Sequence, residues 1–315
     1  MILTLTPNPS LDRALEVDRL EVGGVNRAEA AWVHPGGKGI NVSRVLVAHG
    51  VPTLAVLPVG GADGARLTEL LGEQGVPALP VPVAEDTRTN LTLVERGGTT
   101  TKVNAPGPAL TEDEVEALLA AVEQQLALQP AALVSAGSLP LGAPECFFVR
   151  VAGLAARHAV PFALDTSGLP LTRAVRSGGL ALVKPNDEEL AELVGRELVT
   201  VGDVVEAARE VVAAGTRAVL VSLGAHGALL VSAQRSWWAG GPCLVPQSTV
   251  GAGDSTLAGF LAGDGDAGER LRRAVAFGRA AVLLPGTEVP LPDQIQLDDV
   301  RVVEDPDPRT ALKEL

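Results

Sequence analysis

Strand-like and helix-like segments alternate along most of this chain, and this order restricts the fold more than any other feature. Strands, one of them running into a loop at 161–168, are predicted at residues 2–6, 53–59, 131–137, 161–168, 180–186, 217–224, 227–232 and 243–247. Helices are predicted at residues 40–50, 62–75, 111–128, 144–158, 187–194, 202–214, 253–263 and 268–283. Such an order predicts a mostly parallel sheet covered by helices on both faces.

Two segments, 14–34 and 87–104, interrupt this alternation and are predicted to be hairpins. Each alternates apolar and charged residues around a pair of turn glycines. We expect both hairpins to join in one small sheet over an end of the main sheet. The predicted division is an α/β core made of residues 1–10, 36–86 and 105–315, and a β-sheet lid made of residues 11–35 and 87–104.

The composition excludes several classes of protein. With 38 acidic and 25 basic residues, the formal net charge is −13, which argues against a nucleic-acid partner held by a broad basic face. Two distant cysteines, Cys146 and Cys243, form neither a disulfide framework nor a zinc site and suit a reducing cytosol. No segment has the pattern of a signal peptide or a membrane span. We therefore expect a cytoplasmic protein without a nucleic-acid or membrane partner.

Lysine and asparagine are scarce, in a chain that uses arginine and alanine freely. The lysines are Lys38, Lys102, Lys184 and Lys313, and the asparagines are Asn8, Asn26, Asn41, Asn90, Asn104 and Asn186. One interpretation is that these residues remain where the chemistry requires them. The other is that asparagine simply favours turns.

The segment STVGAGDS at 248–255 is the strongest candidate for a site. Its glycines precede a helical run, and converging backbone N–H groups at a helix N-terminus bind anions. Asp254 lies in the predicted first turn, where a carboxylate could take a proton from a hydroxyl that attacks a phosphoryl group. The alternative is an aspartate that only caps the helix after a glycine turn.

The standard phosphate-binding and dinucleotide-binding loop motifs are absent from the sequence. Two further segments carry weaker signals for a ligand site. In PGGKGIN at 35–41, glycines allow the backbone to approach a ligand, and Asn41 offers a donor and an acceptor. In VKPNDEEL at 183–190, Asn186 and Glu189 lie one helical turn apart, with oxygen atoms that suit Mg²⁺ directly or through water. An ordinary acidic helix start would look the same.

Five motifs, taken in order, resemble those of the ribokinase-like (PfkB) carbohydrate kinases: GGKGIN, DTSG at 165–168, KPNDEE, SLGAHGA and STVGAGDS. The resemblance covers nearly the whole chain. It implies a ribokinase-like three-layer α/β/α sandwich with a mostly parallel central sheet and a small β-sheet lid. Three further runs are similar to sequences of the branch that phosphorylates sugar phosphates: TLTPNPSLDRALEVDRLEVGGVNR, DTRTNLTL and NAPGPAL. They are most similar to members of that branch that act on fructose 1-phosphate.

The resemblance also implies roles for individual residues. Asp254 is expected to be the catalytic base, with the amides of Gly251, Ala252 and Gly253 as an anion hole. Sugar contacts are implied for Asp12, Gly37, Lys38, Asn41 and Ser138. Nucleotide contacts are implied for Lys184, Asn186, Ser222, Gly224 and Gly227, with residues 276–287 covering the adenine. ATP is the expected co-substrate, and Asn186 and Glu189 are expected to organise Mg²⁺ through water.

The two hairpins carry three cations, Arg27, Arg88 and Lys102, that could enclose one phosphate dianion. A kinase for a neutral sugar has no need of them, although hairpin surfaces often carry unrelated charge. An uncovered lid sheet would expose one apolar face, so we expect a homodimer through the lids.

The resulting hypothesis is an ATP-dependent kinase that converts fructose 1-phosphate to fructose 1,6-bisphosphate. Asp254 would deprotonate the 6-hydroxyl, and lid closure would exclude water. Fructose 6-phosphate and tagatose 6-phosphate remain alternative substrates, because the motifs do not fix which end of the sugar carries the phosphate. A sugar-phosphate sensor without catalysis is the alternative from another class of protein.

Overall fold

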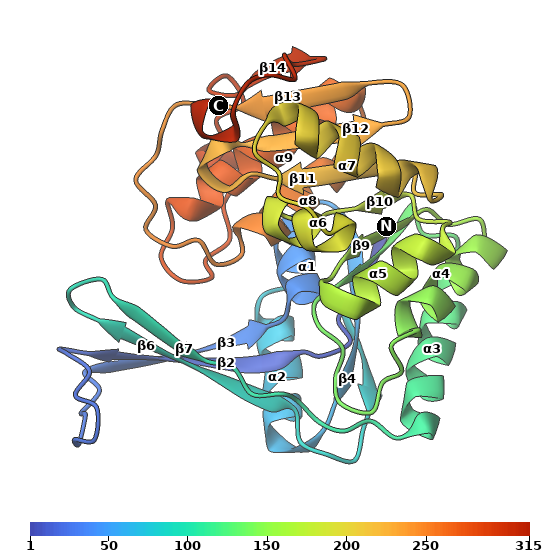
Figure 1. Ribbon diagram of the computed structural model, residues 1–315. Helices are drawn as coiled ribbons and strands as arrows, with labels where there is room; N and C mark the ends of the chain where they lie inside the picture. Colours follow the sequence, from blue (N-terminus) through green and yellow to red (C-terminus); the bar gives the residue numbers. More distant parts are fainter.

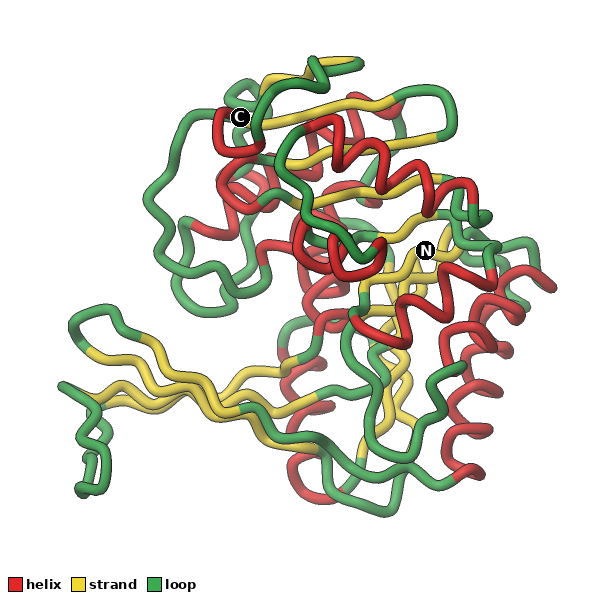
Figure 2. The backbone as a smooth tube through the Cα atoms, viewed as in Figure 1, coloured by secondary structure: helices red, strands yellow, loops and turns green.

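The computed structural model describes residues 1–315 and contains a ten-stranded main sheet and a separate four-stranded sheet (Figures 1 and 2). The strand order of the main sheet is β14-β13-β12-β11-β10-β9-β8-β1-β4-β5. The strands are β1 (Ile2–Leu5), β4 (Thr53–Val59), β5 (Ala78–Pro82), β8 (Ala132–Ala136), β9 (Phe162–Asp165), β10 (Leu182–Val183), β11 (Ala218–Ser222), β12 (Ala228–Ser232), β13 (Ser236–Gly240) and β14 (Arg301–Glu304). All pairs from β5 to β11 are parallel, and the pairs from β11 to β14 are antiparallel.

Helices cover both faces of this sheet, which confirms the predicted three layers. On one face lie α1 (Lys38–Ala48), α2 (Gly61–Glu73), α8 (Ala252–Leu261) and α9 (Ala267–Val282), and on the other lie α3 (Glu112–Leu126), α4 (Phe147–Arg157), α5 (Gly168–Ser177), α6 (Asp187–Val194) and α7 (Val201–Ala213). Neighbouring residues of one strand serve opposite faces: Leu133 belongs to the apolar cluster that α3 to α7 share, and Val134 belongs to the cluster of α1, α8 and α9. This explains the continuous apolar runs, because both faces of a central strand are buried. None of the helices combines the length and the apolar character needed to cross a membrane.

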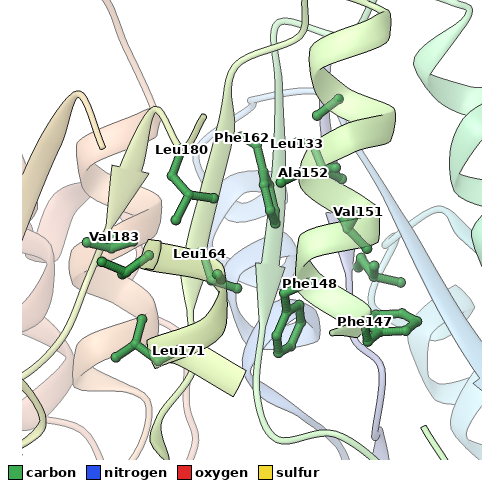
Figure 3. Close-up of a cluster of buried hydrophobic side chains, with 14 of the residues drawn as sticks. Leu133, Phe147, Phe148, Val151, Ala152, Phe162, Leu164, Leu171, Leu180 and Val183 are labelled. Atoms are coloured by element: carbon green, nitrogen blue, oxygen red, sulfur yellow. The ribbon is translucent and has the colours of Figure 1, made fainter. Parts of the chain in front are cut away.

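The core below α4 is built around three fully buried phenylalanines (Figure 3). Phe147 and Phe148 begin α4, and their rings meet edge to face with centroids 5.5 Å apart. Phe162 begins β9 and packs in the same cluster with Leu133 of β8. These contacts fix α4 on the sheet and so fix the strands whose far ends carry the polar motifs.

The small sheet unites the two predicted hairpins, in the order β3-β2-β6-β7. Its strands are β2 (Ser10–Val17), β3 (Ala30–Gly36), β6 (Arg88–Glu95) and β7 (Thr100–Val103). The central pair β2 and β6 is parallel, so the hairpins lie side by side and point the same way. The sheet extends away from the α/β body, and the loop 18–29 lies at its free end (Figure 1).

One predicted strand is wrong, and four elements were not predicted. Residues 243–247 form no strand. Pro242 and Pro246 have no N–H group to donate to a neighbouring strand. The backbone N–H groups of Gln247 and Ser248 instead donate hydrogen bonds to Val282 O at the end of α9. The sheet position is taken by β13, which pairs with β12 and β14. The elements not predicted are β5, α5, β13 and β14.

Candidate active site

The polar motifs meet at the carboxyl-terminal edge of the parallel strands. The chain order reverses beside β1, where β4 and β5 lie on one side and β8 to β11 on the other, and ligands of open α/β sheets bind outside such a switch point. The residues that end or follow strands at this edge are Asn8, Ser138, Asp165, Lys184 and Ser222. The N-termini of α1 and α8 reach the same place, since Lys38 contacts Asp165 and Asn41 contacts Asp254.

Asp254 is buried in the first turn of α8, with 6% of its surface exposed. Gly251 precedes that helix with a φ of 76°, a left-handed conformation that glycine adopts without strain. The carboxylate oxygen Oδ2 accepts a 2.8 Å hydrogen bond from Asn41 Nδ2. Burial and the negative charge of Asp165 raise the pKa of Asp254 to about 6, against the opposing effects of Asn41, Lys38 and Lys184. A carboxylate with this pKa is suited to accept a proton near neutral pH.

Asp165 lies between two lysines from different motifs. Lys38 Nζ is 2.8 Å from Oδ1, and Lys184 Nζ is 3.1 Å from Oδ2. Burial alone would raise the pKa of the Asp165 carboxyl, but the two ammonium groups lower it overall. Lys184 also borders the glycine loop, because a Cβ added to Gly253 would lie 3.3 Å from Lys184 Nζ.

Asp12 faces the site from the small sheet with one oxygen already occupied. Its Oδ1 accepts hydrogen bonds from Ser10 Oγ at 2.6 Å and from Asn90 Nδ2 at 2.9 Å. The carboxylate packs against Gly36, where an added Cβ would lie 2.3 Å from Oδ2. Gly37 has a φ of 123° and directly precedes α1. The predicted sugar contacts Asp12, Gly37 and Asn41 therefore lie along a short path that ends at Asp254.

Ser138 and Arg88 meet at Asn8, a residue to which the sequence analysis gave no role. Asn8 Nδ2 donates to Leu139 O at 3.3 Å and lies 3.4 Å from Ser138 Oγ. The guanidinium of Arg88 donates to Asn8 O at 2.9 Å and to Ala105 O at 2.8 Å. Two sequence signals pointed to Asn8 and Asn90: the scarcity of asparagine, and their place in two of the runs that carry the resemblance.

The three hairpin cations do not surround one point within a single chain. Arg88 starts β6 opposite Ser10, next to the α/β body. Lys102 is exposed opposite Thr92, which is four residues or about 13 Å further along the strand. Arg27 is exposed in the loop at the free end of the sheet. Only Arg88 of the three lies beside the other predicted sugar contacts.

Asn186 and Glu189 form a capping box at the start of α6. Asn186 Oδ1 accepts from Glu189 N at 2.6 Å, and Glu189 Oε2 accepts from Asn186 N at 3.0 Å. This is the structural role that the sequence left open as an alternative. Glu189 Oε1 stays outside the box, and the negative charge of Glu189 contributes to a raised pKa of Lys38. No three His, Cys, Asp or Glu side chains gather as a direct metal cage, so the donor set fits a hydrated cation better than a fully ligated one.

The predicted nucleotide residues lie at the end of β11. Ser222 forms an isolated parallel bridge with Asn186, which places the two motifs side by side. Gly224 begins a short 3₁₀ turn and Gly227 follows it, with φ values of 56° and 84°. A Cβ on Gly227 would lie 2.0 Å from Ala239 O, so this glycine is required by the fold whether or not a nucleotide binds.

Comparison with known proteins identifies the class of enzyme. A family model described as pfkB family carbohydrate kinase matches residues 6–294. The ATP-dependent 6-phosphofructokinase isozyme 2 of Escherichia coli is 39% identical over 94% of this chain and 96% of its own length. The 1-phosphofructokinase of Bacillus subtilis is 37% identical over 84% and 85%.

Solved structures agree with these sequence matches. A phosphofructokinase-2 from E. coli in complex with potassium superposes with a TM-score of 0.87 at 39% identity, over 94% of this chain and 96% of that one. An Arabidopsis thaliana ribokinase complexed with ribose and ATP gives a TM-score of 0.73 at 22% identity, over 93% and 96%, which shows the shared fold. The chain belongs to the PfkB family of carbohydrate kinases. Within that family it is a phosphofructokinase-type sugar kinase with ATP as co-substrate.

Proposed function

We propose that this kinase transfers the γ-phosphoryl group of ATP to the 6-hydroxyl of fructose 1-phosphate and yields fructose 1,6-bisphosphate and ADP. The observation that carries the proposal is the buried Asp254 beside the glycine N-terminus of α8. A base and an anion hole at one helix N-terminus are two of the parts that phosphoryl transfer to an alcohol uses.

In the proposed mechanism Asp254 accepts the proton of the 6-hydroxyl while the hydroxyl oxygen attacks the γ-phosphorus. The bond to the β–γ bridging oxygen breaks, and the amides of Gly251, Ala252 and Gly253 stabilise the charge on the transferring group. Asn41 orients the base through its 2.8 Å hydrogen bond. Asp12 binds a sugar hydroxyl with its Oδ2, because Ser10 and Asn90 occupy Oδ1.

We propose that Asn186 and Glu189 hold Mg²⁺ through water at the strand edge beside Lys184. The support for this role is Glu189 Oε1, which the capping box leaves free. Mg²⁺ held there would supply positive charge that neutralises the phosphates of ATP. Ser222, Gly224 and Gly227 line the nucleotide side, with residues 276–287 at the adenine.

The phosphate of the sugar is proposed to bind Arg88 beside Ser138, whereas the Lys38 ammonium group is held at Asp165. Arg27 and Lys102 of the same chain lie too far along the small sheet to reach Arg88. Arg27 can join the phosphate site only from a second copy whose small sheet packs against this one. The homodimer proposed from the sequence would therefore serve binding as well as stability.

Fructose 6-phosphate is the second candidate substrate, because the relative with 39% identity is named a 6-phosphofructokinase. The identities of 39% and 37% do not separate the two reactions. The preference for fructose 1-phosphate rests on the resemblance of residues 4–27 and of the runs DTRTNLTL and NAPGPAL.

The test is ADP release with Mg-ATP and four acceptors in parallel: fructose 1-phosphate, fructose 6-phosphate, tagatose 6-phosphate and free fructose. The expected result is the highest kcat/KM for fructose 1-phosphate. A higher value for a 6-phosphate would keep the mechanism and replace the substrate. Turnover of free fructose alone would contradict the phosphate role of Arg88, and binding without turnover would favour a sensor.

A further inference from the structure

Asp165 is the point where four separate sequence motifs meet, and the mechanism so far gives it no task. It ends β9 and opens the DTSG segment, and only 1% of its surface is exposed. One oxygen pairs with Lys38 of the GGKGIN segment, and the other pairs with Lys184 of KPNDEE. Lys184 in turn borders Gly253 of the GAGD segment. We call Asp165, Lys38 and Lys184 the lysine clamp.

The two lysines of the clamp differ in exposure and in origin. The side chain of Lys184 is 5% exposed and follows a central strand, whereas that of Lys38 is 42% exposed and begins α1. An ammonium group has three N–H donors, and Asp165 engages only part of them in each lysine. The remaining N–H donors of Lys38 and Lys184 are free to bind a ligand. Such a ligand would lie between the proposed sugar site and the proposed nucleotide site.

The charges of the clamp also suit an anionic ligand. Two ammonium groups and one carboxylate leave a single net positive charge on the clamp. Asp165 and Lys184 are buried, where electrostatic interactions are strong, and Lys38 is the more exposed partner. Lysine side chains are long and flexible, and each loses rotamer freedom when it is held in one place. A shared carboxylate that fixes both of them before the ligand arrives reduces the cost of ordering at the moment of binding.

We propose that Asp165 is a positioning residue that holds the Lys38 and Lys184 ammonium groups beside the Gly251–Gly253 amides, so that both lysines bind the phosphoryl group during its transfer. This inference rests on the proposed kinase function and deepens it. Asp165 itself touches neither the sugar nor ATP in this role. The effect of Asp165, Lys38 and Lys184 on the pKa of Asp254 is consistent with all three lying close to the base.

The first test is Asp165→Asn, which keeps the shape of the side chain and removes its charge. The kcat/KM for ATP is expected to fall by about 100-fold, since removal of the group that orients a charged binding residue commonly costs 10- to 100-fold. The inhibition constant of AMP, which has no β- or γ-phosphate, is expected to change by less than about twofold. A merely structural role would weaken ATP and AMP alike.

A double-mutant cycle with Lys38→Met tests whether Asp165 acts through the lysine. The effect of Asp165→Asn should shrink from about 100-fold to about 10-fold in the Lys38→Met background, because contacting residues are not additive. Thr53→Val is the matched control: Thr53 is a buried polar residue that donates to Ile2 O at the opposite edge of the sheet. This control is expected to lower Tm without changing the ratio of ATP and AMP binding.

Three outcomes would overturn the inference while wild-type turnover leaves the kinase function intact. An Asp165→Asn variant with unchanged kcat/KM for ATP would remove the clamp from the mechanism. Equal loss of ATP and AMP binding would reduce Asp165 to a structural residue. Recovery of full activity at high Mg²⁺ concentration would assign Asp165 to the metal. Absence of turnover in the wild type would instead contradict the proposed function itself.

Discussion

Asp254 is the residue whose removal tests the chemistry most directly. Asp254→Asn keeps the volume and the neighbours of the side chain but leaves no group that can accept a proton. Turnover is expected to fall by about 10³-fold, which lies within the usual contribution of a general base. Binding of ATP and sugar phosphate, measured by calorimetry, is expected to stay within about threefold of wild type. Unchanged turnover would contradict the role of Asp254 as base.

The pH dependence follows from the raised pKa of the same residue. Burial and Asp165 raise the pKa of Asp254 to about 6, so its carboxylate becomes protonated as the pH falls through that value. A protonated carboxyl cannot act as base, and kcat/KM is therefore expected to decrease below about pH 6 and to be constant above it.

Asn41 provides the check on this assignment. Its hydrogen bond stabilises the ionised form and lowers the pKa of Asp254. Asn41→Ala should therefore move the acidic limb of the kcat/KM profile to higher pH, whatever its effect on sugar binding. A limb that stays in place would mean that another group controls it.

At the scale of elements, a substitution at the start of α6 can distinguish a capping role of Glu189 from a metal-binding role. Glu189→Gln keeps a side chain that can complete the capping box but removes the charge. The expected result is an unchanged Tm together with a several-fold higher Mg²⁺ concentration for half-maximal activity. Activity is measured in an Mg²⁺ titration at fixed ATP.

The chain offers a matched control for this substitution in α7. Thr200 and Asp203 form the same kind of capping box there, and neither residue was predicted to bind a ligand. Asp203→Asn should leave the Mg²⁺ titration unchanged. If Glu189→Gln also left it unchanged, Glu189 would serve only the helix.

The elements that could be predicted are those with strong periodicity or clear ends. The helix at 112–126 starts with a Thr111–Glu114 capping box, and the two hairpins show glycine turns between alternating strands. The elements that were missed are short or depend on distant partners. SWWAG becomes β13 because β12 and β14 lie beside it. Residues 243–247 form no strand because Pro246 lacks an N–H donor and Gln247 donates to Val282 O at the end of α9.

At the scale of the whole molecule, the extended small sheet predicts a dimer. Trp32 is 44% exposed on β3, which is unusual for so large an apolar side chain. Sedimentation is expected to give about twice the chain mass of 32.3 kDa. Trp32→Glu should shift the protein toward the monomer, because a charge at a packed contact is costly to bury.

Loss of the dimer should also weaken substrate binding if Arg27 of a second copy completes the phosphate site. Arg27→Ala is then expected to raise the KM for the sugar phosphate about tenfold without changing the sedimentation coefficient. A monomeric wild type with full activity would contradict both the dimer and the role of Arg27.

The sequence alone determined the layers, the two hairpins and the family, because hydrophobic periodicity and glycine motifs are local properties of the chain. It also indicated Asp254, Asn41, Lys184 and Asp12 as one group, although they span most of its length. Only the tertiary structure decided which of these side chains touch. Asp165 meets Lys38 and Lys184 because parallel strands bring distant carboxyl ends to one edge of the sheet. Lys102 falls outside that group because strand register places it further along the small sheet, and Arg27 falls outside it because it lies in the loop at the free end of that sheet.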